Sequence, residues 1–296
     1  MPLPQVSFLA NETIEVYGHK MAYAQMGEGS PIVFLHGNAT SSYLWRNIGP
    51  RLADYGRCVA VDLIGMGKSD KLPGEGAMRY TFAQHADYLY HALDQLQIYK
   101  DAIIVAHGWG AALGFEWAYR YPNRCAGIAY MEALVMPVAS WEAWEEEPRR
   151  LFQTLRSPAG EKLVLEDNVY IDKVLMSALP RNLGEGVLAR YRAPFADPGE
   201  GRRPLLDWAL QVPIAGEPPD MAALIEGYST WLARSDLPKL FIDADPGALT
   251  VGPLRRFCRT WANQDTVRIP AGHYVPEDNP KALAQALLNF VLKLRA

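Results

Sequence analysis

Cysteine is scarce in this chain of 296 residues, which contains only three. Cys58, Cys125 and Cys258 form no C-x-x-C pair, so their spacing indicates neither a disulfide framework nor a zinc site. Long apolar runs are missing too, since no stretch approaches the roughly 18 apolar residues of a membrane helix. Residues 1–16 lack the basic and apolar regions of a secretion signal. These absences predict a cytoplasmic protein without a membrane partner.

An excess of positive charge is also absent. Lys and Arg number 29 against 33 for Asp and Glu, and neither sign forms a long block, which argues against a nucleic-acid partner. Hydrophobic residues, by contrast, make up 49% of the chain, enough for a large core, and 24 Gly with 22 Pro are ordinary for a globular protein. The composition favours a globular domain that acts on small molecules.

Strand patterns alternate with helical ones through most of the chain. Residues 13–17 and 20–26 predict a hairpin around Gly18. Short apolar runs at residues 32–35, 58–61 and 102–105 predict strands buried on both faces, which are typical of a parallel sheet flanked by helices. Further strands are predicted at residues 127–131, 239–242 and 266–269.

Two helix starts can be located from capping residues. Thr81 and Gln84 have the spacing of a capping box ahead of an amphipathic stretch. Asn279 followed by Pro280 predicts the start of a final helix.

The alternation is interrupted over residues 137–213, which are rich in aromatic residues, Arg and Pro and contain no convincing strand. We therefore predict an inserted helical cap at residues 137–213. The core then consists of residues 1–136 and 214–296.

A sharp turn is predicted where the strand near residue 105 ends. Ala106 and Gly110 bracket His107, Gly108 and Trp109, and this pattern of small residues is typical of a nucleophile elbow between a strand and a helix. The central residue, Gly108, has no side chain. The glycines alone also fit an ordinary tight turn.

Other residues with catalytic potential follow in a consistent chain order. His36 comes directly after a buried strand, and His273 precedes the last helix. A catalytic histidine needs a carboxylate that fixes its tautomer and stabilises the imidazolium. Glu132 and Asp245 both follow predicted strands, and their spacing alone does not decide between them.

Several segments together resemble the haloalkane dehalogenases, in the subfamily whose catalytic acid is glutamate. The resemblance spans nearly the whole chain, cap included, and implies an α/β-hydrolase fold. It is carried by residues 35–46 (LHGNATSSYLWR), 62–70 (DLIGMGKSD), 130–133 (YMEA), 202–204 (RRP), 212–216 (VPIAG), 241–249 and 272–278 (GHYVPED).

The resemblance implies roles for individual residues. By position, Asn38 and Trp109 would donate N–H groups to the departing halide, His273 would activate water, and Glu132 would orient it. In the family an aspartate at the elbow attacks the carbon that bears the halogen, whereas this chain has Gly108.

Glycine can form no alkyl ester, so the covalent route is impossible at this position. One lost nucleophile among retained partners is what a deliberate substitution would leave. We therefore hypothesise an engineered variant of an active dehalogenase whose hydrolysis is disabled or strongly weakened at Gly108.

The resemblance also implies an apolar pocket that accepts halogenated alkanes and halide. We predict neither a metal nor a cofactor, and a monomer or weak homodimer. The expected pocket walls are Trp144, Phe152, Tyr170, Ala178, Trp208, Leu249 and Tyr274.

Two other functions remain open from the sequence. The protein could bind ligands without turnover, using the pocket as a capture site. Alternatively, His273 and Glu132 could abstract a proton in a cofactor-free enzyme of the oxygenase or luciferase type built on the same fold.

Overall fold

The computed structural model describes residues 8–144 and 146–296. Residues 1–7, where the predicted core begins, and Glu145 in the predicted cap lie outside the described residues. The described residues form an eight-stranded sheet in the order β1-β2-β4-β3-β5-β6-β7-β8. Its strands are β1 (Glu12–Val16), β2 (His19–Met26), β3 (Pro31–Leu35), β4 (Arg57–Val61), β5 (Ala102–His107), β6 (Cys125–Met131), β7 (Lys239–Pro246) and β8 (Gln264–Ala271).

The sheet is mostly parallel, as the sequence predicts. The β1–β2 and β2–β4 pairs are antiparallel, and every pair from β4 to β8 is parallel. All six predicted strands are present and are longer than predicted. The three predicted to be buried, β3, β4 and β5, are buried over nearly their whole length, whereas β8 at the sheet edge is mostly exposed. The largest extensions are in β7 and β8, whose later residues include Asp245 and Pro270. Their pairing depends on backbone groups, which an apolar pattern does not reveal.

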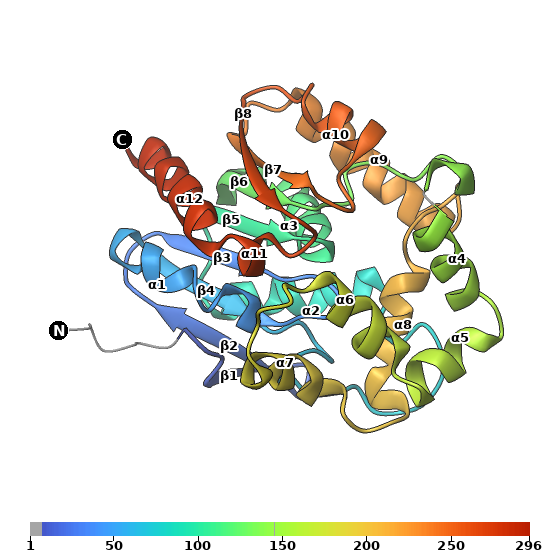
Figure 1. Cartoon of the computed structure of the whole chain (residues 1–296). Helices are drawn as coiled ribbons and strands as arrows, with labels where there is room; N and C mark the ends of the chain where they lie inside the picture. The colour runs from blue at the N-terminus through green and yellow to red at the C-terminus, as the bar shows by residue number, and fades with distance from the viewer. Residues whose placement is uncertain (1–7, 145) are drawn as a thin grey trace.

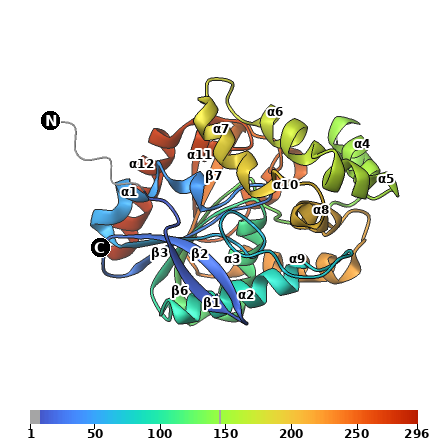
Figure 2. The same cartoon turned by 90° about the horizontal axis from the view of Figure 1, so that it is seen from below.

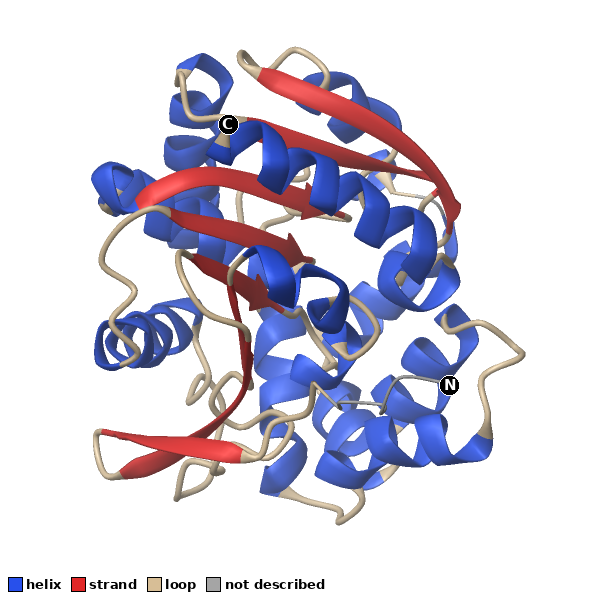
Figure 3. Ribbon diagram, turned by 90° about the vertical axis from the view of Figure 1, so that its left-hand side faces the viewer, coloured by secondary structure: helices blue, strands red, loops and turns tan. Residues whose placement is uncertain are grey.

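Helices cover both faces of the sheet (Figures 2 and 3). On one face α12 (Pro280–Arg295) packs against α1 (Gly49–Leu52), and on the other α3 (Trp109–Arg120) packs against α2 (Phe82–Gln95) and α9 (Pro219–Arg234). Two predicted caps are confirmed. Thr81 and Gln84 form a reciprocal capping box at α2, and Asn279 accepts from the N–H of Ala282 at the start of α12. Within the described ranges, no helix combines the length and apolar character required to cross a bilayer.

The chain between β6 and β7 contains several short helices that lie together at one side of the sheet (Figure 1). The stretch up to residue 214 closes on itself, because Val138 exchanges backbone hydrogen bonds with Pro213 and Ala215 at 2.9 Å each. Its α-helices are α4 (Glu146–Leu155), α5 (Ala159–Glu161), α6 (Met176–Ala178), α7 (Glu185–Arg192) and α8 (Arg203–Leu210). The last helices of the core are α10 (Gly252–Cys258) and α11 (Val275–Asp278).

The parallel register brings the ends of several strands to one level. Leu35 of β3 pairs with Ala106 of β5, and His107 of β5 pairs with Met131 of β6. The residues that follow these strands therefore emerge side by side at the carboxyl edge of the sheet, where ligands bind in folds of this kind.

Candidate active site

A sharp turn connects β5 to α3, as the elbow pattern predicts. Gly108 has a φ of +57° and stands as the N-cap of α3, and its carbonyl accepts from the N–H of Ala111 at 3.1 Å. A Cβ on Gly110 would overlap the carbonyl oxygens of Leu35 and His36. The turn thus requires glycine at 110 because β3 approaches the helix so closely.

The surroundings of Gly108 are different. An ideal Cβ placed on it would contact only the Cα of Gly37, at 3.6 Å, apart from its own chain neighbours. This is ordinary van der Waals distance. The space beside Gly108 would therefore admit a side chain, although the positive φ would strain most residue types.

Glu132 and His273 form a hydrogen-bonded pair next to this turn. The Nδ1–H of His273 donates to Oε2 of Glu132 at 3.0 Å, and the backbone N–H groups of Ala248 and Leu249 donate to the same oxygen at 2.8 and 2.7 Å. The Glu132 side chain is only 1% exposed. Because the carboxylate holds Nδ1, the lone pair of Nε2 remains available as a general base.

Asp245, the other candidate acid, is placed elsewhere. Its carboxylate pairs with Arg268 at 2.8 Å, and its side chain is 43% exposed. It lies within β7, before the loop that reaches Glu132. Of the two carboxylates that spacing left as alternatives, Glu132 and Asp245, only Glu132 contacts His273.

Two further histidines near the elbow, His107 and His36, are buried. The Nε2–H of His107 donates to the carbonyl of His273 at 2.9 Å, and the two rings meet edge to face at 4.6 Å. Burial lowers the pKa of His107 well below its usual value, so this ring stays neutral. His36 is also buried with a lowered pKa, and its Nε2 accepts from the N–H of Leu63 at 3.0 Å. Both rings act as uncharged hydrogen-bonding spacers.

Asn38 and Trp109 lie on the two chain segments that approach each other at the elbow, since Gly37 lies close to the backbone of Gly108 and Trp109. Asn38 follows Gly37, and its Nδ2 donates one N–H to the carbonyl of Leu205 in α8 at 3.0 Å, which leaves a second N–H on the same nitrogen. The Oδ1 of Asn38 is buried and has no hydrogen-bond partner among the described residues. The ring of Trp109 lies 4.5 Å from that of Trp208.

Four of the predicted pocket residues lie around these groups. Trp208 is fully buried against Trp109, and Leu249 contributes its N–H to Glu132. Tyr274 is buried with its ring 4.8 Å from that of His273. Burial raises the pKa of Tyr170 to about 12, against a smaller opposing effect of a hydrogen bond with the Asn38 side chain. The phenol of Tyr170 is therefore protonated at neutral pH.

The other three predicted wall residues are half-buried in the region of the short helices. Trp144 and Phe152 meet edge to face at 4.6 Å, and Ala178 ends α6. Their contribution to the pocket stays a prediction.

Some groups that build the site were not found from the sequence. The carbonyl of Leu205 and the N–H groups of Ala248 and Leu249 are backbone groups, which no residue type reveals. Glu277, just after His273, accepts hydrogen bonds from Arg46 and from Tyr191 of α7. It thus connects the loop that bears His273 to the segment between β6 and β7.

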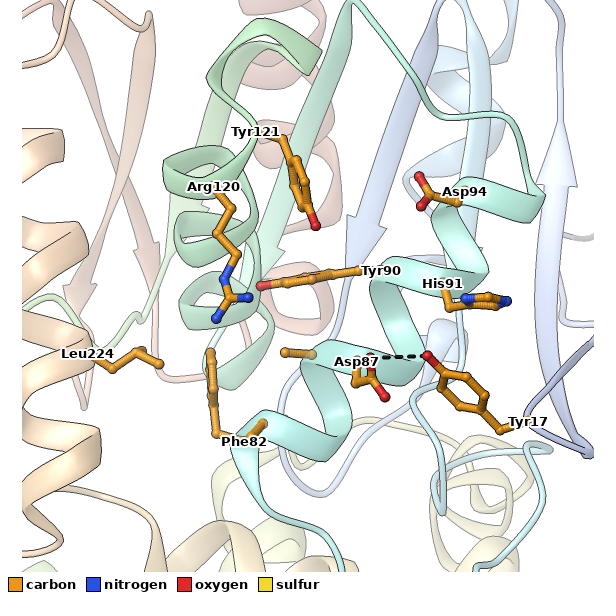
Figure 4. Close-up of a pocket in the computed structure, with 11 residues that line it drawn as sticks. Tyr17, Phe82, Asp87, Tyr90, His91, Asp94, Arg120, Tyr121 and Leu224 are labelled. Atoms are coloured by element: carbon orange, nitrogen blue, oxygen red, sulfur yellow. Dashed lines mark hydrogen bonds between the residues drawn. The ribbon is translucent and has the colours of Figure 1, made fainter.

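An open pocket of about 370 Å³ lies on another part of the surface (Figure 4). Asp87 and Tyr90 on α2 and Arg120 on α3 line it, and the Tyr17 hydroxyl donates to Asp87 at 3.1 Å. Neither His273 nor Glu132 reaches this pocket, so it is separate from the candidate active site.

Comparisons with known proteins identify the family and the fold of the chain. Residues 30–280 match the family model described as alpha/beta hydrolase fold. A haloalkane dehalogenase of Sphingobium indicum is 50% identical over 295 residues, covering 100% of this chain and 99% of that protein. One of Mycolicibacterium smegmatis is 45% identical and covers 95% and 91%. The crystal structure of a haloalkane dehalogenase from Bradyrhizobium elkani matches with a TM-score of 0.88 at 37% identity, covering 96% of this chain and 98% of that one.

Proposed function

This chain belongs to the haloalkane dehalogenase family of α/β hydrolases, and from that premise we propose that it binds halogenated alkanes and halide but does not hydrolyse the carbon–halogen bond. One observation carries the proposal. Gly108, at the elbow turn before α3, offers no nucleophile, although the chain retains the His273–Glu132 hydrogen bond.

The roles of the individual residues follow from chemistry. Asn38 and Trp109 would hold the halide through their N–H groups and so stabilise the negative charge that develops on it as the bond breaks. His273 would take a proton from water at Nε2, and Glu132 would stabilise the resulting imidazolium. With Gly108 no alkyl ester forms, so the water-activating pair has no ester to hydrolyse.

We also propose that residues 137–213 act as a cap over the site. The backbone hydrogen bonds of Val138 with Pro213 and Ala215 support these boundaries, because they join the two ends of the segment. Trp208 and Leu205 of α8 extend from this segment to Trp109 and Asn38. An apolar cover of this kind would exclude water around a haloalkane.

The retained partners further support a single substitution at Gly108 in an active parent. Asn38, Trp109, Glu132 and His273 are all retained in the sequence, whereas drift would be expected to erode them together. Sequencing the gene from its natural source tests this origin. A glycine codon at position 108 in that source would overturn it.

The function is tested by halide release from a panel of bromo- and chloroalkanes. The chain, its Gly108→Asp variant and its Gly108→Ala variant are assayed side by side, the alanine form being the matched control that adds a Cβ without a carboxylate. We expect release only from the aspartate form, at a rate about 10⁴- to 10⁶-fold higher, as found when catalytic nucleophiles are removed from other enzymes.

Quenching of tryptophan fluorescence by bromide and iodide tests the binding part, because Trp109 would contact the halide. Saturable quenching in the unmodified chain is the expected result. If the aspartate form releases no halide, the pocket serves another reaction. Proton abstraction by His273 and Glu132, assayed on acidic heterocycles and ketones under oxygen, is then the next function to test.

A further inference from the structure

The loop that bears His273 carries a second buried carboxylate, Glu277, whose side chain is only 1% exposed. Nη1 of Arg46 donates to its Oε1, and Nη2 of Arg46 donates to its Oε2 at 2.8 Å. The hydroxyl of Tyr191 also donates to Oε1. Burial raises the pKa of Tyr191 well above its usual value, so this hydroxyl keeps its proton. Both oxygens of Glu277 are therefore held by donors of the protein.

The three partners come from three separate parts of the chain. Glu277 lies on α11, Arg46 follows Asn38 in the segment after β3, and Tyr191 lies on α7 between β6 and β7. The guanidinium of Arg46 lies 4.2 Å from the ring centre of Tyr43, and the Tyr43 ring meets that of Tyr191 edge to face at 5.5 Å. This cluster joins the segments that bear Asn38 and His273 to the predicted cap.

A displacement of Glu277 would be passed on to His273, because local hydrogen bonds hold the loop between them together. The N–H of Gly272 donates to Oδ2 of Asp278 at 2.8 Å. The carbonyl of Tyr274 accepts from the N–H groups of Glu277 and Asp278 at 2.8 and 2.9 Å. Residues 272–278 therefore form one closed unit, in which the histidine and Glu277 lie four positions apart.

A buried ion pair is poorly explained as a device for stability alone. Removing two charges from water is costly, and apolar side chains of similar size often stabilise a fold at least as well. A guanidinium that holds both oxygens of a carboxylate does, however, fix their direction. Direction matters for a general base, since a misplacement of about 1 Å can lower a reaction rate about 100-fold. The cluster is thus better suited to orienting the loop than to stabilising it.

We infer that Glu277 is a positioning residue for His273 and that Tyr191 completes it, so that α7 must lie against Glu277 for His273 to stay hydrogen-bonded to Glu132. Neither Glu277 nor Tyr191 contacts the reacting atoms in this account. Without the Tyr191 hydroxyl the loop would sample positions in which Nδ1 of His273 leaves Glu132. The consequence for turnover rests on the proposed function, whereas the consequence for this hydrogen bond does not.

The first test uses the chain itself and its Tyr191→Phe variant, which removes one hydroxyl and keeps the ring. Proton NMR follows the Nδ1–H of His273, which donates to Glu132 and is assigned by its loss in His273→Gln. We expect this proton to exchange with water about 3- to 10-fold faster in Tyr191→Phe, the equilibrium factor of one lost hydrogen bond.

A second Tyr–Glu–Arg cluster elsewhere in the fold supplies the matched control. The hydroxyl of Tyr90 donates to the buried Glu116, which pairs with Arg120, next to the surface pocket (Figure 4). Tyr90→Phe therefore removes the same kind of hydrogen bond without touching the loop of His273. Its urea denaturation measures the loss of stability, and the exchange of the His273 proton should stay unchanged.

A larger perturbation keeps the shape of the cluster but removes its charge. Glu277→Gln leaves Arg46 without a carboxylate, so exchange of the His273 proton should be faster than in Tyr191→Phe. Circular dichroism shows whether this variant folds, and if it does not, Tyr191→Phe alone decides the inference.

Kinetics in the Gly108→Asp background separate positioning from general loosening. The aspartate would attack the haloalkane before His273 acts, so Tyr191→Phe should leave the burst of halide release within about twofold and slow hydrolysis of the ester about 3- to 10-fold. Rapid-quench halide analysis gives the burst, and steady-state release gives the hydrolysis.

The outcomes can be told apart. Unchanged exchange of the His273 proton in Tyr191→Phe would show the inference to be wrong, and so would an equal acceleration in Tyr90→Phe, since the effect would then be general. Equal losses in the burst and in hydrolysis would also overturn it. If Gly108→Asp releases no halide, the proposed function fails, and the NMR comparison still decides the inference.

Discussion

The loops that follow β5 and β6 reach the same edge of the sheet with different chemical content. After β6, Glu132 accepts hydrogen bonds from His273 and from two backbone N–H groups. After β5, the turn retains a glycine at 110 that β3 requires, yet Gly108 presents no side chain. The parallel register of β5 and β6, in which His107 pairs with Met131, brings both loops to this edge. The geometry of a site and its reactivity are therefore encoded by different residues.

The largest expected effect comes from a double variant that regains the nucleophile at position 108 and loses the base at position 273. Gly108→Asp combined with His273→Ala restores the nucleophile but removes the base, so one halide per protein molecule is released and the alkyl ester persists. Turnover should be slower than in Gly108→Asp alone by about 10⁴-fold. Rapid-quench halide analysis and intact-protein mass spectrometry measure the burst and the adduct. Continuous turnover at the rate of Gly108→Asp would contradict the role given to His273.

A smaller effect should separate the two carboxylates that sequence left as alternatives. In the Gly108→Asp background, Glu132→Gln should lower kcat by about 10²- to 10⁴-fold, because a neutral amide cannot stabilise the imidazolium. Asp245→Asn should change it by less than about twofold, since that exposed carboxylate pairs only with Arg268 among the described residues. Steady-state halide release measures both. Equal losses would show that Asp245 also acts on His273.

The two glycines of the elbow should differ in stability. Gly110→Ala should lower the free energy of unfolding by about 2–3 kcal/mol, because its Cβ would overlap the carbonyl oxygens of Leu35 and His36. Gly108→Ala meets open space and should cost about 1 kcal/mol, the strain of a positive φ. Urea denaturation measures both. A larger loss for Gly108→Ala would mean that the space beside Gly108 is not open.

The smallest effect is expected at Tyr274, a predicted pocket residue beside His273. Tyr274→Phe keeps the ring that stacks on His107 at 5.4 Å and removes only a buried hydroxyl. The free energy of unfolding should change by less than about 1 kcal/mol. In the Gly108→Asp background the KM for apolar bromoalkanes should fall about threefold, because the wall loses a polar group. A rise in KM would show that the hydroxyl binds the substrate.

Local signals in the sequence were sufficient for the elements of the fold. The capping residues Thr81 and Asn279 identified two helix starts that the structure confirms, because a cap depends only on residues three positions apart. The ends of the strands were harder to predict from the sequence, as the polar extensions of β7 and β8 show. There the strands continue through backbone hydrogen bonds that side-chain patterns do not report.

In the candidate site, too, some features follow from the sequence alone and others only from the tertiary structure. The sequence by itself determined that position 108 has no nucleophile, since the absence of a side chain does not depend on the fold. Only the tertiary structure decided which carboxylate meets His273, because Glu132 lies 141 residues away along the chain. It also brought the Leu205 carbonyl to Asn38 across 167 residues. Such pairs depend on strand order and register, which arise from packing of the whole chain rather than from local sequence.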